Sequence, residues 1–300
     1  MALPYADRFT FASDDLWLSE FRLPPGHPGW NRVDRTTDGA TLVAFPRTAV
    51  AIRQERRAEV VADPLSAVLY SPGQAYRRRL ISPLGDDCTV LAVSQDLVRE
   101  VVDEFDSSAN AAAFRFPFSA ALLERDDHRA IERLRRIVTL APETDGDAVR
   151  EELYWILQRV VCNGYRHVQP EVLSTTARAH RDLAQSVREE LGRDVASTMS
   201  LADLAHAFAV SPFHLVRTFR STTGRPIHAY RTELRLRSSL PLIADGVRLA
   251  DVAQQVGFAS HAHLTDRFTR AYGFSPVKWR EASSKSSKNM EAQVRESLIA

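Results

Sequence analysis

The chain repeats one arrangement of apolar and small residues near its C-terminal end. The sequence LADLA at 201–205 returns as LADVA at 249–253, a shift of 48 residues. Four residues after its last alanine, each copy has a small residue followed by an apolar one, with Ala209 in the first copy and Gly257 in the second. Each copy therefore predicts a short helix that ends in a tight turn.

A second, capped helix is predicted after each turn. It begins at a serine that can cap it, has apolar residues four positions apart that make one buried stripe, and ends at a glycine. A short helix, a tight turn and a second capped helix make a helix-turn-helix, whose second helix lies in the major groove of DNA. The matching positions of the two copies are Ser211 and Ser260, Leu215 and Leu264, Phe219 and Phe268, and Gly224 and Gly273.

One helix, from Pro226 to about Ala244, is predicted to connect the two motifs. It would span about 28 Å, compared with about 34 Å between successive major grooves on one face of B-DNA. The segment can therefore set one recognition helix in each of two grooves. Pro241 lies within it and predicts either a kink or an earlier end near Leu240.

Two helix boundaries are expected just before the repeat. A helix over 179–191 should end at Gly192. Ser200 should then cap the next helix, with Asp203 completing an acidic variant of the capping box. Pro212 would occupy the first position of the following helix, where its missing N–H costs nothing.

Between Trp17 and Val93 the pattern changes to short β-rich runs separated by turn residues such as Asp38-Gly39. Several strands about ten residues apart predict a sandwich or a barrel. The runs are 16–23, 41–45, 49–53, 59–62, 67–70, 76–81 and 89–93.

Three amphipathic helices are predicted next, over 95–105, 128–140 and 148–162, the third ending at Asn163-Gly164. The last two carry more apolar face than one barrel wall needs. That surplus leaves two interpretations open, a dimer surface and packing within the chain.

Composition agrees with more than one domain. The 300 residues are 44% apolar, enough for two ordinary cores. Residues 178–282 carry 15 Lys and Arg against 10 Asp and Glu, whereas residues 1–177 carry 21 against 26. The basic balance predicts that only the second half meets a polyanion, the alternative being a merely solvated surface.

The segment 200–280 closely resembles the DNA-binding domain of the AraC/XylS family of bacterial transcription regulators. The resemblance rests on the strings 211–219, 224–226, 257–264 and 273–280. The order of strands before it, with Phe45-Pro46 and Ser71-Pro72-Gly73 in place, is similar to the cupin-type sensor domain found ahead of such domains.

The implied fold class is multi-domain α+β: a cupin-like β-barrel, an α-helical hairpin, and an all-α DNA-binding domain with two helix-turn-helix motifs. The expected boundaries are 1–106 for the barrel, 107–168 for the hairpin, 169–178 for a linker, 179–282 for the DNA-binding domain and 283–300 for a flexible tail.

The outward faces of the two recognition helices supply the candidate DNA contacts. From the helical period and the resemblance, they are Phe213, His214, Val216, Arg217 and Arg220 in the first helix, and His261, Ala262, Thr265, Asp266 and Arg270 in the second. His263 and Thr269 also face outward. The resemblance itself implies base contacts at Phe213, Val216, Arg217, His261, Ala262, Thr265 and Asp266.

Arg217 is the strongest single candidate, because a guanidinium can bond both O6 and N7 of guanine for roughly 1–3 kcal/mol of discrimination. Asp266 departs from the family, which often has a basic residue there. Near phosphates it must either accept a hydrogen bond from a cytosine amine or pair with a neighbour such as Arg270. Candidate phosphate contacts, each equally able to be a bystander, are Arg231, Arg235, Arg237 and Arg248.

A basic run from Tyr76 to Arg79 is the most positive part of the first half. Strand alternation puts Arg77 and Arg79 on one face, and Tyr76 and Arg78 on the other. One pair could clamp an anionic effector inside the barrel, whereas solvated edge charges are the alternative. The candidate effector contacts are Trp30, Tyr76, Arg77 and Arg79, with Tyr70 as a further pocket aromatic, and the aromatic residues can equally be core.

Several classes of protein are excluded by what the sequence lacks. His27 is the only histidine before His128, so the ligand set of a metal-binding cupin is missing, and no metal, cofactor or catalytic residue is expected. Cys88 and Cys162 fit buried thiols in a reducing compartment, with a redox pair as the alternative. Without a membrane span or signal peptide, we expect a soluble cytoplasmic protein.

The predicted function is that of a sequence-specific DNA-binding transcription regulator, and the resemblance implies activation. Expected partners are double-stranded promoter DNA, RNA polymerase, a small effector in the barrel and a second copy bound through 128–162. The alternatives are a ligand-independent regulator or repressor whose N-terminal domain only dimerises, an enzyme that the motif delivers to DNA, and an interaction protein whose repeats bind protein.

Overall fold

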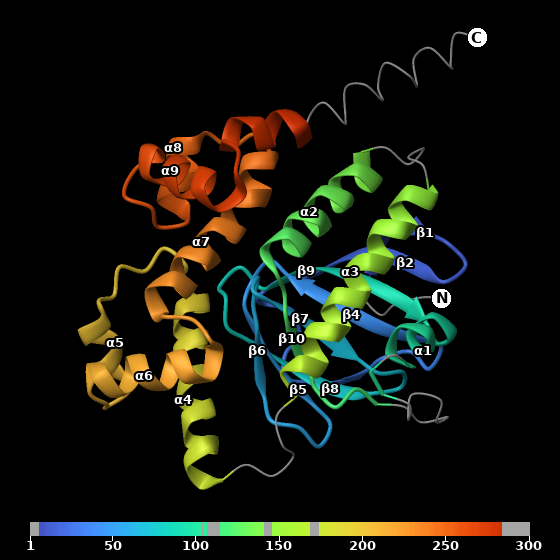
Figure 1. Ribbon diagram of the computed structural model, residues 1–300, viewed down its shortest axis with the longest axis horizontal. Coiled ribbons are helices and arrows are strands. Elements are labelled where there is room, and N and C mark those ends of the chain that lie inside the picture. Colours follow the sequence, from blue (N-terminus) through green and yellow to red (C-terminus); the bar gives the residue numbers. More distant parts are fainter. Residues whose placement is uncertain (1–5, 104, 107–114, 141–145, 169–173, 284–300) are drawn as a thin grey trace.

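The computed structural model describes residues 6–103, 105, 106, 115–140, 146–168 and 174–283. Two antiparallel sheets face each other in the N-terminal part, and a group of helices lies beside them (Figure 1). In sheet order, the six-stranded sheet is β1 (Ala6–Ala12), β2 (Leu16–Leu23), β9 (Asp86–Ser94), β4 (Ala40–Pro46), β7 (Ser66–Tyr70) and β10 (Ala120–Leu122), and the four-stranded sheet is β3 (Val33–Arg35), β8 (Ala75–Leu80), β5 (Val50–Gln54) and β6 (Val60–Ala62).

The six-stranded sheet is apolar on both faces because each face is covered. Along β2, Leu16 and Leu18 pack against helices, while Phe21 and Leu23 on the alternate face point to the second sheet. The period of two along a strand produces this division. The seven predicted strands are confirmed to within a few residues at each end, and the structure adds β1, β3 and β10.

Three helices cover the outer face of this sheet: α1 (Gln95–Asp103), α2 (Arg125–Leu140) and α3 (Gly146–Arg166). The sequence left two interpretations of the apolar stripes of α2 and α3, a dimer surface and packing within the chain. In the structure, these stripes are buried against the sheet of the same chain. Trp155, 47% exposed, is the large apolar side chain that α3 still presents outward.

Further helices form two small units that share one member. The labelled ones are α4 (Thr175–Arg193), α5 (Leu201–Ala207), α6 (Pro212–Thr223), α7 (Ile227–Ala244), α8 (Leu249–Gln255) and α9 (His261–Tyr272). Tyr230 and Leu234 of α7 belong to the core under α5 and α6, whereas Leu240 and Ile243 belong to the core under α8 and α9. The connecting helix is therefore a structural element of both motifs.

The predicted caps of these helices are confirmed. Ser200 and Asp203 make the reciprocal capping box, and the Ser211 and Ser260 side chains accept hydrogen bonds from the backbone N–H groups three residues on. Gly224 and Gly273 end α6 and α9 in the left-handed conformation.

Two glycines expected to stop helices lie inside them instead. α3 continues through Gly164 to Arg166, and α4 continues through Gly192 to Arg193. A Cβ at Gly164 would lie 2.1 Å from the Phe118 ring, and one at Gly192 would lie 2.5 Å from Ala49 Cβ. Both predictions were wrong because these glycines permit close packing rather than a left-handed turn.

Two other expectations about the chain path are modified. α7 continues past Pro241 to Ala244 rather than ending near Leu240. α4 begins at Thr175, inside the expected linker 169–178. Residues 169–173 of that linker and 284–300 of the expected tail lie outside the described residues. In the part of the chain that is described, no helix is long and apolar enough to cross a membrane.

The turn between β6 and β7 joins the sheets to the helical units. Leu65 of this turn is buried in the core under α5 and α6. Arg237 of α7, whose side chain is 0% exposed, donates hydrogen bonds to the Pro64 carbonyl at 2.9 Å and the Leu123 carbonyl at 2.8 Å. The middle of the connecting helix is thus fixed to the N-terminal part.

Candidate nucleic-acid interface and effector pocket

The outer face of α6 consists of exposed side chains, while its inner stripe is fully buried. Leu215 and Phe219 anchor the inner side. The capping serine and the proline at the first position fix the N-terminal turn of the helix. The predicted outward residues are where the helical period places them: Phe213 is 75% exposed, His214, Arg217 and Arg220 are exposed, and Val216 is half-buried.

The second motif repeats this geometry on α9. Leu264 and Phe268 are buried on its inner side. In Figure 1, α9 lies beside the upper part of α7, and α6 lies below its lower end. The predicted outward residues again have that orientation: His261, Ala262, Asp266 and Arg270 are exposed, and Thr265 is half-buried.

The two motifs differ at one turn. Ala209, with φ of 52°, and Gly257, with φ of 82°, occupy the left-handed position after the first helix of each motif. The capping serine follows two residues later in the first copy and three residues later in the second, so the offset between copies rises from 48 to 49. Sequence comparison at a single offset misses this insertion.

Asp266 pairs with a neighbour, as one of its two predicted alternatives required. Its carboxylate lies 2.8 Å from the Arg270 guanidinium, one turn along α9. The pair is largely exposed, so it contributes little to stability. Its effect is to reduce the negative charge that α9 presents to a phosphate backbone.

Arg267 is an exposed cation of α9 that the sequence analysis did not select. Its Nε lies 3.4 Å from His263 Nε2 on the preceding turn. A basic residue next to Asp266 was the available signal, but the helical wheel drawn from Leu264 and Phe268 did not single it out.

Most of the arginines considered as phosphate contacts bond to other parts of the protein instead. Arg231 donates to the Met199 carbonyl, and Arg235 donates to the Val195 and Ser197 carbonyls. Arg237 is buried, so the suggestion that it meets a phosphate was wrong. Arg248 remains exposed and pairs with Asp251.

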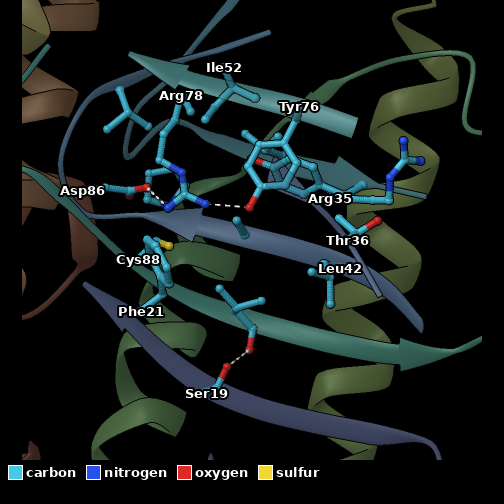
Figure 2. A pocket seen from close by; sticks show the side chains of 17 residues that line it. Ser19, Phe21, Arg35, Thr36, Leu42, Ile52, Tyr76, Arg78, Asp86 and Cys88 are labelled. Atoms are coloured by element: carbon cyan, nitrogen blue, oxygen red, sulfur yellow. Dashed lines mark hydrogen bonds and ion pairs between the residues drawn. The ribbon is translucent and has the colours of Figure 1, made fainter. Parts of the chain in front are cut away.

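A cavity between the two sheets is the candidate effector pocket (Figure 2). Tyr76 and Arg78 of β8 line it. Arg77 and Arg79 do not, so their selection as pocket residues was wrong: Arg77 is exposed, and Arg79 pairs with Glu59 at 2.7 Å and Glu189 at 2.8 Å. Strand alternation left the choice of face open, and burial of the Tyr76 face decides it.

Trp30, the remaining effector candidate, packs against the edge of the core between the sheets and does not line the cavity. Its indole Nε1 donates to the Pro24 carbonyl at 2.8 Å. Tyr70 and Cys88 do line the cavity.

The helical units are similar in sequence to known proteins. Residues 204–282 match the family model described as a helix-turn-helix domain. The HTH-type transcriptional regulator YbfI of Bacillus subtilis is 25% identical over 207 residues, which cover 69% of this chain and 72% of YbfI.

Other relatives match over a smaller part of their length. The HTH-type transcriptional activator RhaR of Klebsiella pneumoniae is 30% identical, over 37% of this chain and 44% of RhaR. The bifunctional transcriptional activator and DNA repair enzyme AdaA of Bacillus subtilis is 31% identical, over 28% of this chain and 39% of AdaA. This chain therefore aligns with less than half of either protein.

Among solved structures, ToxT of Vibrio cholerae aligns over 90% of this chain and 99% of its own, with 13% identity and a TM-score of 0.35. A DNA-binding transcriptional dual regulator of Escherichia coli aligns over 34% of this chain and 93% of its own, with 25% identity and a TM-score of 0.32.

Proposed function

We propose that the protein binds promoter DNA sequence-specifically and regulates transcription, with its C-terminal third as the double helix-turn-helix domain of an AraC-type transcription regulator. One observation carries the proposal. Two recognition helices with buried inner stripes and exposed outer faces are joined by one helix that belongs to both units. At 18 residues, α7 spans about 27 Å, which suits two successive major grooves.

The side chains divide into two roles. Arg217 reads a guanine through its guanidinium, and Phe213 and Val216 supply apolar contacts to thymine methyl groups. On α9, His261 and Thr265 can hydrogen-bond base edges, whereas Arg270 and the remaining cations bond phosphates. Ion pairing of Asp266 with Arg270 makes α9 the weaker reader, so most base discrimination comes from α6.

Regulation takes the form of activation, with the bound protein holding DNA beside RNA polymerase. A small effector in the cavity between the sheets controls it, and a second copy can assemble on the outer face of α3 around Trp155. Repression would use the same DNA contacts.

An enzymatic role is disfavoured by the thiols, although the relative AdaA is bifunctional by name. Cys88 is buried, and burial raises the pKa of its thiol well above the usual value, so the reactive thiolate does not form. Cys162 is half-buried on α3, in the part that packs against the sheet.

The proposal is tested by selecting bound fragments from genomic DNA with the purified full chain and measuring affinity across salt concentrations. We expect affinity for selected duplexes to fall steeply with salt. Arg217→Ala should lower affinity for the selected site by roughly 1–3 kcal/mol and affinity for random DNA much less.

Arg99→Ala on α1 is the matched control, because it removes the same charge far from the motifs. Equal losses on selected and random DNA would make Arg217 a phosphate contact. A chain that ignores duplex DNA at low salt would end the proposal.

A further inference from the structure

The cavity between the sheets has a defined size and an apolar wall. Its volume is about 60 Å³, several times the roughly 10–15 Å³ that one water molecule needs. Both sheets contribute to its walls. Because side chains alternate along a strand, every second residue of each facing strand points into the cavity. The apolar lining includes Phe21, Leu42, Ala44, Val68 and Val90.

One end of the cavity holds the buried guanidinium of Arg78. Figure 2 shows it directed at the Tyr76 hydroxyl, to which Nη2 donates, and at Asp86, whose carboxylate lies 3.4 Å from Nη1. Asp34 lies 3.5 Å from Nη2. The Nε–H of Arg78 is buried and has no hydrogen-bond partner among the described residues. A buried cationic donor without an acceptor is costly, so this group favours a ligand that brings one.

Tyr70 supplies a second donor in the same cavity. Its side chain is 7% exposed and lines the cavity, and its ring centroid lies 4.8 Å from that of Tyr76. Within the described part of the chain, its hydroxyl makes no hydrogen bond. A phenolic O–H can donate, so the unpaired groups at this end are both donors.

The unpaired Nε–H of a cation favours a charged acceptor over a neutral one. Arg35 lines the mouth and donates to the Gly73 carbonyl at 2.6 Å, and no carboxylate of the described chain pairs with it. Asp34 and Asp86 pair with the Nη groups of Arg78. The cavity therefore offers two unpaired donors, and one of them, the Nε–H of Arg78, belongs to a guanidinium.

We propose that this cavity binds a small monocarboxylate, with its oxygens on Arg78 Nε and the Tyr70 hydroxyl and its short apolar body between Phe21, Val68 and Val90. The proposal names the ligand class of the effector pocket and depends on the proposed function only for the consequence of binding. The small volume excludes large hydrophobic ligands, because the wall would have to open to admit them.

Isothermal titration calorimetry of the full chain without DNA tests the ligand class. The probes are isobutyrate, isobutyramide and isobutanol, which share one branched body and differ in the polar head. We expect isobutyrate to bind at least tenfold more tightly than either neutral probe, because only its carboxylate forms an ion pair with the Arg78 guanidinium and brings two strong acceptor oxygens. Equal or tighter binding of a neutral probe, or no binding of isobutyrate at millimolar concentration, would overturn the proposal.

Three variants locate the site. Tyr70→Phe should weaken isobutyrate binding about fivefold through the loss of one hydrogen bond, and Ala44→Leu should abolish binding by filling the cavity. Arg77→Gln, on the opposite face of the strand that carries Arg78, should bind normally although it loses a positive charge. Isobutyrate binding that survives Ala44→Leu in a folded variant, or a Tyr70→Phe variant that binds as the wild type does, would place the carboxylate elsewhere.

Failure here is distinguishable from failure of the proposed function. DNA affinity is measured on the same preparation without any carboxylate. Salt-dependent DNA binding together with no carboxylate binding would reject the ligand class and leave the DNA-binding proposal standing.

Discussion

Tyr230 of α7 donates a hydrogen bond to the carboxylate of Asp63, in the turn between β6 and β7, and both side chains are buried. The same carboxylate lies 3.1 Å from the Arg188 guanidinium of α4. Ala62, which precedes Asp63, lines the cavity between the sheets. The candidate effector pocket and the point where α4 and α7 are held are therefore formed by adjacent residues.

Substitution Asp63→Asn should destabilise the whole chain. It leaves the Arg188 guanidinium buried without its counter-ion, and loss of one partner of a buried pair costs about 3–5 kcal/mol. Urea denaturation followed by circular dichroism measures the free energy of unfolding. Asp182→Asn, at an exposed position of α4, removes a charge of the same sign and should change that free energy by less than about 0.5 kcal/mol. Similar losses in both variants would mean that the pair does not join the two parts.

Arg237 and Arg220 should behave oppositely in DNA binding. Arg237→Gln removes donors from the Pro64 and Leu123 carbonyls, so it should lower the free energy of unfolding by about 3 kcal/mol and leave the salt dependence of DNA affinity unchanged. Arg220→Gln, on the exposed face of α6, should keep stability and reduce the slope of log affinity against log salt by about 1 if it bonds a phosphate. A changed slope for Arg237→Gln at a temperature where it is folded would contradict this assignment.

The two turn residues predict stability changes of opposite sign. Ala209 holds φ of 52° on an exposed turn, a conformation that costs an alanine roughly 1 kcal/mol, so Ala209→Gly should raise the melting temperature. Gly257→Ala should lower it, because the new Cβ would lie 2.6 Å from Ala196 Cα and 2.9 Å from its carbonyl oxygen. Differential scanning calorimetry checks both variants. A stabilising Gly257→Ala would show that the backbone at Ala196 can move away.

The tandem motif was predictable because its information is local. Capping serines, a left-handed glycine and stripes four residues apart act within one or two turns of helix, so Ser211, Gly224 and Leu215 have the predicted roles. The inner and outer faces of α6 and α9 follow from the same short-range periodicity. The base contacts at these positions remain predictions.

The misassigned residues depend on contacts between segments far apart in sequence. Gly164 and Gly192 carry the usual signal of a helix end, yet each is selected by a side chain that approaches it from the sheet region. Nothing in the local sequence distinguishes Arg237 from an exposed arginine, because its burial depends on the distant turn between β6 and β7. Packing against the opposite sheet likewise decides which face of β8 lines the cavity. Alternation alone says only that the Arg77 and Arg78 side chains lie on opposite faces of the strand.

Asp86 makes carboxylate binding depend on pH. Burial raises the pKa of this carboxyl to about 6, against the opposing effect of the Arg78 guanidinium. The other titratable side chains that act on it are Asp87, Arg47, Cys88, Tyr70 and Tyr76. Burial raises the pKa values of the last three as well, so these three stay protonated between pH 6 and 8.

A carboxylate bound beside Arg78 repels the Asp86 carboxylate and raises its pKa further, so binding takes up a proton. By linkage, isobutyrate affinity should then increase as pH falls from about 8 to 6, by at most tenfold per pH unit, and level off once Asp86 is protonated in the free chain. Asp86→Asn should bind more tightly at pH 8 and show a flat profile, while Asp34 still pairs with Arg78 in that variant. Calorimetry in buffers of different ionisation enthalpy counts the protons directly. Affinity that decreases on acidification over this range, or an Asp86→Asn variant with the wild-type slope, would assign the proton to another group.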